Sequence, residues 1–121
     1  INTFYLTLME LTLFEKIINR DIAADIIFED DKSIVIKDIA PQAPTHLLII
    51  PKKSIKMVSS ASDSDCQILG HLLLVAKKVA KDIDLKDTFR LVINNGAKAG
   101  QSVFHLHIHL LSGRPMNWPP G

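Results

Sequence analysis

The segment Phe104-His105-Leu106-His107-Ile108-His109-Leu110 alternates apolar residues with histidines. Successive side chains of a β-strand point to opposite faces of a sheet. The pattern therefore predicts a strand, within residues 102–111, that presents three imidazoles on one face and packs its apolar side chains into the core. At about 3.3 Å of rise per residue, the three rings would form a row about 13 Å long.

The chain on the N-terminal side of this strand predicts the rest of the sheet. Two β-rich runs, 25–29 and 33–38, are separated by the turn-like Asp30-Asp31-Lys32, and they predict a hairpin. Apolar runs at 45–50 and 88–93 predict two further short strands.

Two amphipathic stripes complete the expected architecture. Residues 11–19 predict a short helix, and an apolar stripe of 3.6-residue period from Ile68 to Ile83 predicts a long one that starts at a cap on Ser62. Asp65 stands in the capping-box position after Ser62, and Cys66 is expected in the core. The chain is therefore expected to be α+β, with a five-stranded antiparallel sheet, a short N-terminal helix and one long helix.

Composition limits the class of protein further. Of the 121 residues 47% are hydrophobic and 22% are charged, which suits one globular domain over residues 11–121. Residues 1–10 are expected to be an N-terminal extension, either poorly ordered or added to the natural chain, without a secretory leader. The net charge of +1 argues against direct binding of nucleic acids, and no apolar run is long enough for a membrane-spanning helix. With one cysteine, we expect a soluble protein of the cytoplasm, or also of the nucleus.

Three histidines on one face suit two chemistries. Strand-borne His-x-His can bind zinc, but acidic residues do not cluster beside the three histidines to complete a metal site. Alternatively, the middle imidazole attacks as a nucleophile while its neighbours orient it or donate protons. The small polar loop over residues 94–102 favours the second chemistry, because Gln101, Ser102 and exposed backbone N–H groups can donate to phosphate oxygens.

The chain resembles a known family at several places. His105-Leu106-His107-Ile108-His109-Leu110-Leu111 matches the His-φ-His-φ-His-φ-φ signature of the histidine triad (HIT) superfamily, where φ is apolar. Five further segments resemble its Hint branch, the histidine triad nucleotide-binding proteins: Ile27-Phe28-Glu29-Asp30-Asp31, Asp38-Ile39-Ala40-Pro41-Gln42-Ala43-Pro44-Thr45-His46, Ile50-Pro51-Lys52-Lys53, Gly100-Gln101-Ser102-Val103 and Trp118-Pro119-Pro120-Gly121. The resemblance runs from about Leu13 to Gly121.

This resemblance implies both an assembly and an activity. The assembly is a homodimer in which two five-stranded sheets join into one of ten strands. The activity is hydrolysis of purine nucleoside 5′-phosphoramidates, such as an AMP–amine, to the nucleotide and the free amine, with no cofactor required and zinc not expected to serve catalysis. Two rivals are a nucleotide-binding scaffold with incidental hydrolysis and a dinucleoside polyphosphate hydrolase of the Fhit branch. The Trp-Pro-Pro-Gly ending argues against the latter.

The same resemblance implies catalytic roles for five residues. His107 would be the nucleophile and would form a nucleotidyl-histidine intermediate that water cleaves. His109 and Ser102 would contact the phosphate and the leaving amine. His105 and His46 would orient the nucleophile or relay protons to it.

It also implies a set of substrate-binding residues, none of them a metal ligand. Asp38 would accept hydrogen bonds from the ribose hydroxyls, and Trp118 would reach toward the partner subunit's site. The side chains expected around the base are Phe14, Ile17, Ile22, Phe28 and Ile39. The groups expected around the phosphate are Asn94, Gly100, Gln101, Ser102 and Val103.

Overall fold

The computed structural model describes residues 10–121. In chain order the elements are α2 (Leu13–Ile18), β1 (Ile26–Glu29), β2 (Ser33–Lys37), β3 (Thr45–Pro51), the 3-10 turns η1 (Val58–Ser60) and η2 (Asp63–Asp65), α3 (Cys66–Asp82), β4 (Arg90–Val92), η3 (Ala97–Ala99) and β5 (Ile108–Ser112). The N-terminal extension predicted over residues 1–10 lies almost wholly outside the described residues.

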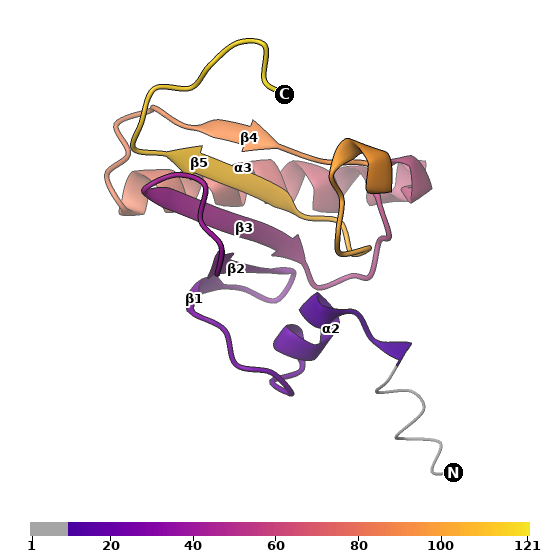
Figure 1. Cartoon of the computed structure of the whole chain (residues 1–121). Coiled ribbons are helices and arrows are strands. Elements are labelled where there is room, and N and C mark those ends of the chain that lie inside the picture. Colours follow the sequence, from indigo (N-terminus) through magenta and orange to yellow (C-terminus); the bar gives the residue numbers. More distant parts are fainter. Residues whose placement is uncertain (1–9) are drawn as a thin grey trace.

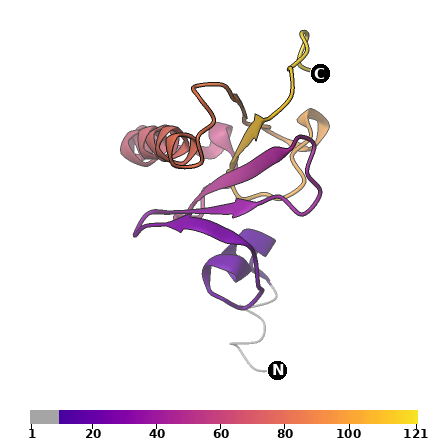
Figure 2. The same ribbon diagram turned by 90° about the vertical axis from the view of Figure 1, so that its left-hand side faces the viewer.

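The predicted architecture is confirmed. The five strands form one antiparallel sheet in the order β1-β2-β3-β5-β4 (Figure 1). The long helix α3 covers one face of this sheet, and the short helix α2 lies against the other face near β2 (Figure 2). Among residues 10–121, no helix combines the length and the apolar character that crossing a membrane requires.

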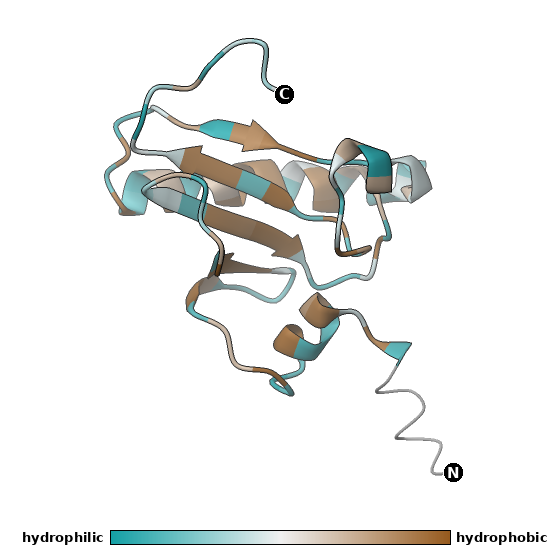
Figure 3. Cartoon of the chain, in the orientation of Figure 1, coloured by the Kyte–Doolittle hydropathy of each residue, from teal (hydrophilic) through white to brown (hydrophobic). Residues whose placement is uncertain are grey.

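Each face of the sheet has its own hydrophobic cluster. Leu47 and Ile49 of β3 pack with the apolar stripe of α3, whereas Leu48 and Ile50 pack with Phe14 of α2 and its neighbours. Because both faces of β3 are covered, its sequence is a continuous apolar run rather than an alternating one, as Figure 3 shows. The α2 face is the one that carries the histidines of interest.

The last strand is shorter than the sequence predicts. It begins at Ile108, which pairs with Ile49, and not at residue 102. The partner strand β3 ends at Pro51, and the Leu106 N–H donates to the Ile55 carbonyl at 2.7 Å instead of to a β3 residue. Residues 102–107 therefore lead into the sheet without belonging to it.

The start of α3 also differs from the prediction. Cys66 is exposed, because the stripe buried against the sheet runs from Leu72 to Ala80 and leaves the first turn of the helix open. The predicted capping pair is present: the Ser62 N–H donates to Asp65 Oδ2 at 2.9 Å. It caps the short turn η2 that leads into α3.

Candidate active site

A cavity of about 260 Å³ lies on the α2 face of the sheet. Its apolar lining residues are Leu13, Phe14, Ile17, Ala23, Ala24, Ile36, Ile39, Leu48 and Val103. Its polar lining residues are Lys37, Asp38, Ser102, His107 and His109. The cavity therefore offers an apolar surface for a flat ring next to hydrogen-bonding groups.

His107 presents an unprotonated nitrogen to this cavity. Its Nδ1 lies 2.7 Å from the main-chain oxygen of His105, and since a carbonyl only accepts, Nδ1 carries the proton. The edge of the Phe14 ring packs on the imidazole with the centroids 4.8 Å apart. Burial lowers the pKa of His107 below the ordinary 6.5 and outweighs the hydrogen bond to the His105 carbonyl, which raises it, so the ring is neutral at pH 7. Nε2 therefore holds a lone pair, as a nucleophile must.

His105 contributes to the site from outside the cavity. It is fully buried and does not line the cavity; its Nε2 donates to the Pro51 carbonyl at 2.7 Å. Its Nδ1 has no hydrogen-bond partner among the described residues, and burial lowers its pKa. The residue acts on the cavity through its own carbonyl, which holds the His107 ring in one tautomer.

His46 and His109 form a hydrogen-bonded pair. The main-chain N–H of Gln42 donates to His46 Nδ1 at 3.0 Å, so the proton of that neutral ring lies on Nε2. This Nε2 is 2.9 Å from His109 Nδ1 and 3.4 Å from Asp38 Oδ2. His109 Nδ1 therefore accepts, which leaves His109 Nε2 as the protonated nitrogen.

The pKa of His109 agrees with a neutral ring that is protonated on Nε2 alone. Burial, followed by the charges of His107 and His46, lowers its pKa from the ordinary 6.5 to about 4. At neutral pH the cavity thus contains one imidazole that accepts at Nε2, His107, and one that donates at Nε2, His109. Neither assignment could be made from the sequence: that of His107 depends on the local backbone path that brings the His105 carbonyl to its Nδ1, and that of His109 depends on the distant residues His46 and Gln42.

Several predicted binding residues do line the cavity. The structure brings Phe14, Ile17, Asp38, Ile39, Ser102 and Val103 together around it with His107 and His109. Ile22 does not line it and is partly exposed, while the neighbouring Ala23 and Ala24 do. Trp118 is 82% exposed and does not line the cavity.

The placement of Phe28 around the base is wrong. A bulge in β1 between Ile26 and Phe28 breaks the alternation of side chains. Ile26 packs toward α2, but Ile27 and Phe28 both pack in the cluster against α3, where Lys78 lies over the Phe28 ring. Phe28 is thus part of the core on the opposite face of the sheet.

The predicted phosphate contact of the Gln101 side chain is also wrong. Its Nε2 donates to the carbonyls of Lys56 and Val103, and its Oε1 accepts from the Gly96 N–H at 2.8 Å. The buried amide therefore has no donor left for a ligand and instead holds the loop in place. Gly100, with φ +100°, lies against Asn94: a Cβ there would come within 3.4 Å of the Asn94 amide. Asn94 and Gly100 shape the loop and do not line the cavity.

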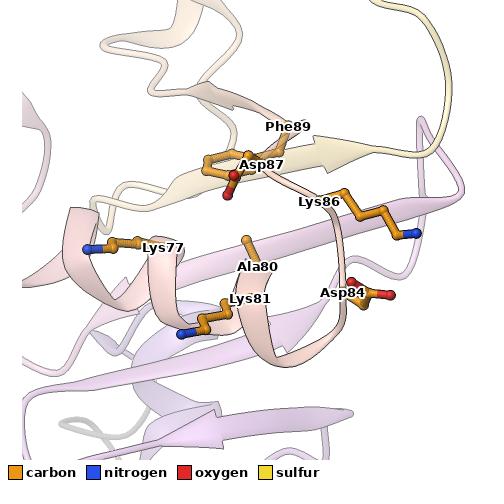
Figure 4. Close-up of a pocket in the computed structure, with 7 residues that line it drawn as sticks. All are labelled: Lys77, Ala80, Lys81, Asp84, Lys86, Asp87 and Phe89. Atoms are coloured by element: carbon orange, nitrogen blue, oxygen red, sulfur yellow. The ribbon is translucent and has the colours of Figure 1, made fainter.

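A second cavity, of about 290 Å³, lies at the C-terminal end of α3 (Figure 4). It is lined by Lys77, Ala80, Lys81, Asp84, Lys86, Asp87 and Phe89. Figure 4 shows Lys77 and Lys81 extending to one side and Lys86 to the other, and no histidine lines this cavity. Its chemistry is unrelated to that of the histidine cluster.

Known proteins share the whole domain. A HIT domain family model matches residues 19–116. An uncharacterized HIT-like protein of Synechocystis sp. is 58% identical over 112 residues, which cover 93% of this chain and 98% of that protein. A 14 kDa zinc-binding protein of Zea mays is 51% identical over 112 residues, covering 91% and 88%.

Solved structures agree with these sequence matches. A HIT family hydrolase from Legionella pneumophila Philadelphia 1 has a TM-score of 0.89 at 47% identity and covers 92% of this chain and 100% of its own. A histidine triad nucleotide-binding protein from Candida albicans has a TM-score of 0.75 at 32% identity, covering 90% and 83%. The fold and the clustered histidines are those of a histidine triad protein. The chain belongs to the HIT family, which confirms the resemblance at the level of the family.

Folding stability is expected to fall as the pH decreases from 7 to 5. Between the folded pKa of about 4 and the ordinary 6.5, the unfolded chain binds the proton that folded His109 excludes, so acid favours unfolding. This residue alone contributes about 1–2 kcal/mol over that interval. His105 and His107, with pKa values lowered by burial, add in the same direction.

Urea unfolding at the two pH values measures this effect. The variant His109→Asn is the control, since it keeps a polar side chain but cannot titrate, and its pH dependence should be weaker. Equal free energies of unfolding at pH 7 and pH 5 in the unaltered protein would contradict the assignment.

Proposed function

We propose that the protein hydrolyses purine nucleoside 5′-phosphoramidates to the nucleotide and a free amine, as a member of the Hint branch. The observation that carries the proposal is the pairing of tautomers in one cavity: an accepting Nε2 on His107 beside a donating Nε2 on His109. Cleavage of a P–N bond needs both of these nitrogens: one supplies the electron pair that attacks phosphorus, and the other supplies the proton for the leaving nitrogen. The hydrolase and nucleotide-binding names of the solved relatives point the same way.

The proposed reaction has two steps. In the first, His107 Nε2 bonds to phosphorus and the P–N bond to the amine breaks, while the departing nitrogen takes the proton of His109 Nε2; the positive charge of the phosphorylated His107 ring balances the negative charge left on the hydrogen-bonded pair of His109 and His46. In the second, water adds its hydroxyl to phosphorus, the P–Nε2 bond breaks with its electron pair returning to His107 Nε2, and the remaining proton of the water returns to His109 Nε2. Ser102, which also lines the cavity, would donate to the phosphoryl oxygens.

The rest of the cavity suits a purine nucleoside. The apolar side chains of Phe14, Ile17 and Ile39 would contact the base. Asp38, which also lines the cavity, would accept from ribose hydroxyls; its Oδ1 also accepts from the Ala40 N–H at 2.8 Å, which holds the carboxylate in place.

A homodimer is part of the proposal, because Trp118 is a large apolar residue left 82% exposed and would complete the site of a partner subunit. Sedimentation should give about twice the chain mass of 13.5 kDa, and a monomer would exclude this arrangement.

A metal-binding function is the second candidate. One ligand atom each of Asp38, His46 and His109 lie within 4.8 Å of one another, and the Zea mays relative is named for zinc binding. Imidazole and carboxylate are ligands that zinc accepts. In our proposal zinc is not needed for the reaction, because the close contacts of these groups already serve the hydrogen-bonded pair.

Release of AMP from adenosine 5′-phosphoramidate is expected to proceed unchanged, within about twofold, when EDTA is present. The purified protein is assayed with and without the chelator, with metal analysis of the same sample and a diadenosine polyphosphate as a second substrate. Loss of turnover in EDTA that zinc restores would favour the metal candidate. AMP binding without turnover would favour a nucleotide-binding scaffold, and preference for the dinucleotide would favour Fhit-type chemistry.

A further inference from the structure

Arg114 links the C-terminal tail to the loop that carries Asp38. It lies two residues beyond the end of β5 at Ser112, and its guanidinium Nε and Nη2 both donate to the main-chain oxygen of Gln42, at 3.1 and 3.0 Å. Its third nitrogen, Nη1, donates to the Pro115 carbonyl and contacts Met116 Sδ within the tail. The side chain is exposed and lies outside the cavity, so it has no contact with the space where substrate would bind.

Gln42 is the residue whose main-chain N–H determines the tautomer of His46. That N–H donates to His46 Nδ1 at 3.0 Å, while the Gln42 carbonyl on the other side of the same Cα accepts from Arg114. The Gln42 side chain donates to the Ala40 carbonyl at 3.0 Å, which ties the residue to the turn after Asp38. Holding the carbonyl restricts rotation about the Gln42 backbone and so keeps its N–H directed at the imidazole.

The consequence of losing this direction can be followed atom by atom. Without the Gln42 donor, His46 can carry its proton on Nδ1, and its Nε2 then becomes an acceptor. Because His46 Nε2 and His109 Nδ1 are 2.9 Å apart, one of them must carry a proton, and it would then be His109 Nδ1. His109 Nε2 would lose its proton, and the cavity would contain two accepting nitrogens and no imidazole donor.

We infer that Arg114 is a positioning residue that acts through the Gln42 peptide to hold His46 and His109 in the tautomers that place a donor in the cavity. The structural part of this inference concerns the free protein and stands alone. Its kinetic part rests on the proposed phosphoramidate hydrolysis.

The first test reads the tautomers themselves. Long-range ¹H–¹⁵N spectra of the histidine rings at pH 7.5 distinguish protonated from unprotonated nitrogens in the free protein. In the unaltered chain, His46 is expected to be protonated at Nε2 only. In Arg114→Met, the His46 and His109 signals are expected to move toward the opposite tautomers.

The matched control is Arg90→Met. Arg90 also donates to a carbonyl of the tail, that of Asn117 at 2.9 Å, but it makes no hydrogen bond to Gln42. This variant should leave the ring spectra unchanged. Unchanged spectra in Arg114→Met, or the same change in both variants, would overturn the inference whatever the activity of the protein.

The second test is kinetic. Arg114→Met should lower kcat for adenosine 5′-phosphoramidate by about tenfold or more while KM changes by less than about threefold, because the donor and not the binding surface is altered. Arg114→Lys keeps one donor to the Gln42 carbonyl, so its kcat should lie between those of the unaltered protein and of Arg114→Met. A fall confined to KM, or no fall, would overturn the kinetic part, and an unaltered protein without turnover would refute the proposed function instead.

Discussion

Substitution of His107 by alanine is expected to lower turnover of adenosine 5′-phosphoramidate by at least about 10³-fold. The variant removes the only imidazole nitrogen in the cavity whose lone pair is free, since the proton of His107 is held on Nδ1 by the His105 carbonyl. AMP should still bind, because the apolar wall and Asp38 are unchanged. Steady-state release of AMP and calorimetric titration with AMP measure the two quantities.

His71→Ala is the matched control for that variant. It also removes an imidazole, but one that lies on α3 and pairs with Asp30 at 2.7 Å, outside the cavity. Its turnover should stay within about twofold of that of the unaltered protein. Turnover retained in His107→Ala would assign the nucleophile to another group, and loss of AMP binding together with turnover would point to a damaged site.

Substitution of Gly113 by alanine is expected to destabilise the fold by about 2–3 kcal/mol. Gly113 follows β5 with φ +99°, a backbone conformation that L side chains rarely adopt. A Cβ there would lie 2.7 Å from Cβ of Pro44 and 3.0 Å from its Cγ. Pro44 is a rigid ring in the loop that carries Asp38 and Gln42, so it cannot move aside without displacing the site.

Gly70→Ala is the control for this glycine. Gly70 lies within α3, and a Cβ there would have nothing within 4 Å, so alanine should raise stability by about 0.5–1 kcal/mol through its higher helix propensity. Chemical denaturation of both variants compares the two free energies of unfolding. Equal stability of Gly113→Ala and the unaltered protein would contradict the close packing of the tail on the loop.

Local patterns in the sequence predicted the architecture because each depends on nearby residues. The hairpin of β1 and β2, the strand β3 and the long helix α3 lie where their periodicity places them. The errors occur where a distant contact overrides the pattern. Residues 102–107 lie outside the strand, where the Leu106 N–H donates to the Ile55 carbonyl and not to β3, and Phe28 changes face because of a bulge that its apolar neighbours do not reveal.

The candidate site likewise contains residues that the sequence could predict and one whose role it could not. His107, His109, Asp38 and Ser102, which line one cavity, could be predicted from residue types, spacing and the resemblance to the HIT family. Gln101 shows the limit: its residue type suits a phosphate contact, but its side chain is fully occupied by main-chain groups of the loop.

The sequence by itself determined the five-stranded α+β fold, the family and which imidazoles would be candidates for chemistry. Only the tertiary structure decided which nitrogen of each ring carries its proton. The reason is physical: a neutral imidazole can hold its proton on either nitrogen, and the choice depends on the group that faces it. For His105, His107 and His46 those groups are main-chain atoms, the carbonyls of Pro51 and His105 and the N–H of Gln42, and main-chain atoms are the same for nearly every residue type. The group that faces His109 is the His46 ring, whose own tautomer depends on Gln42.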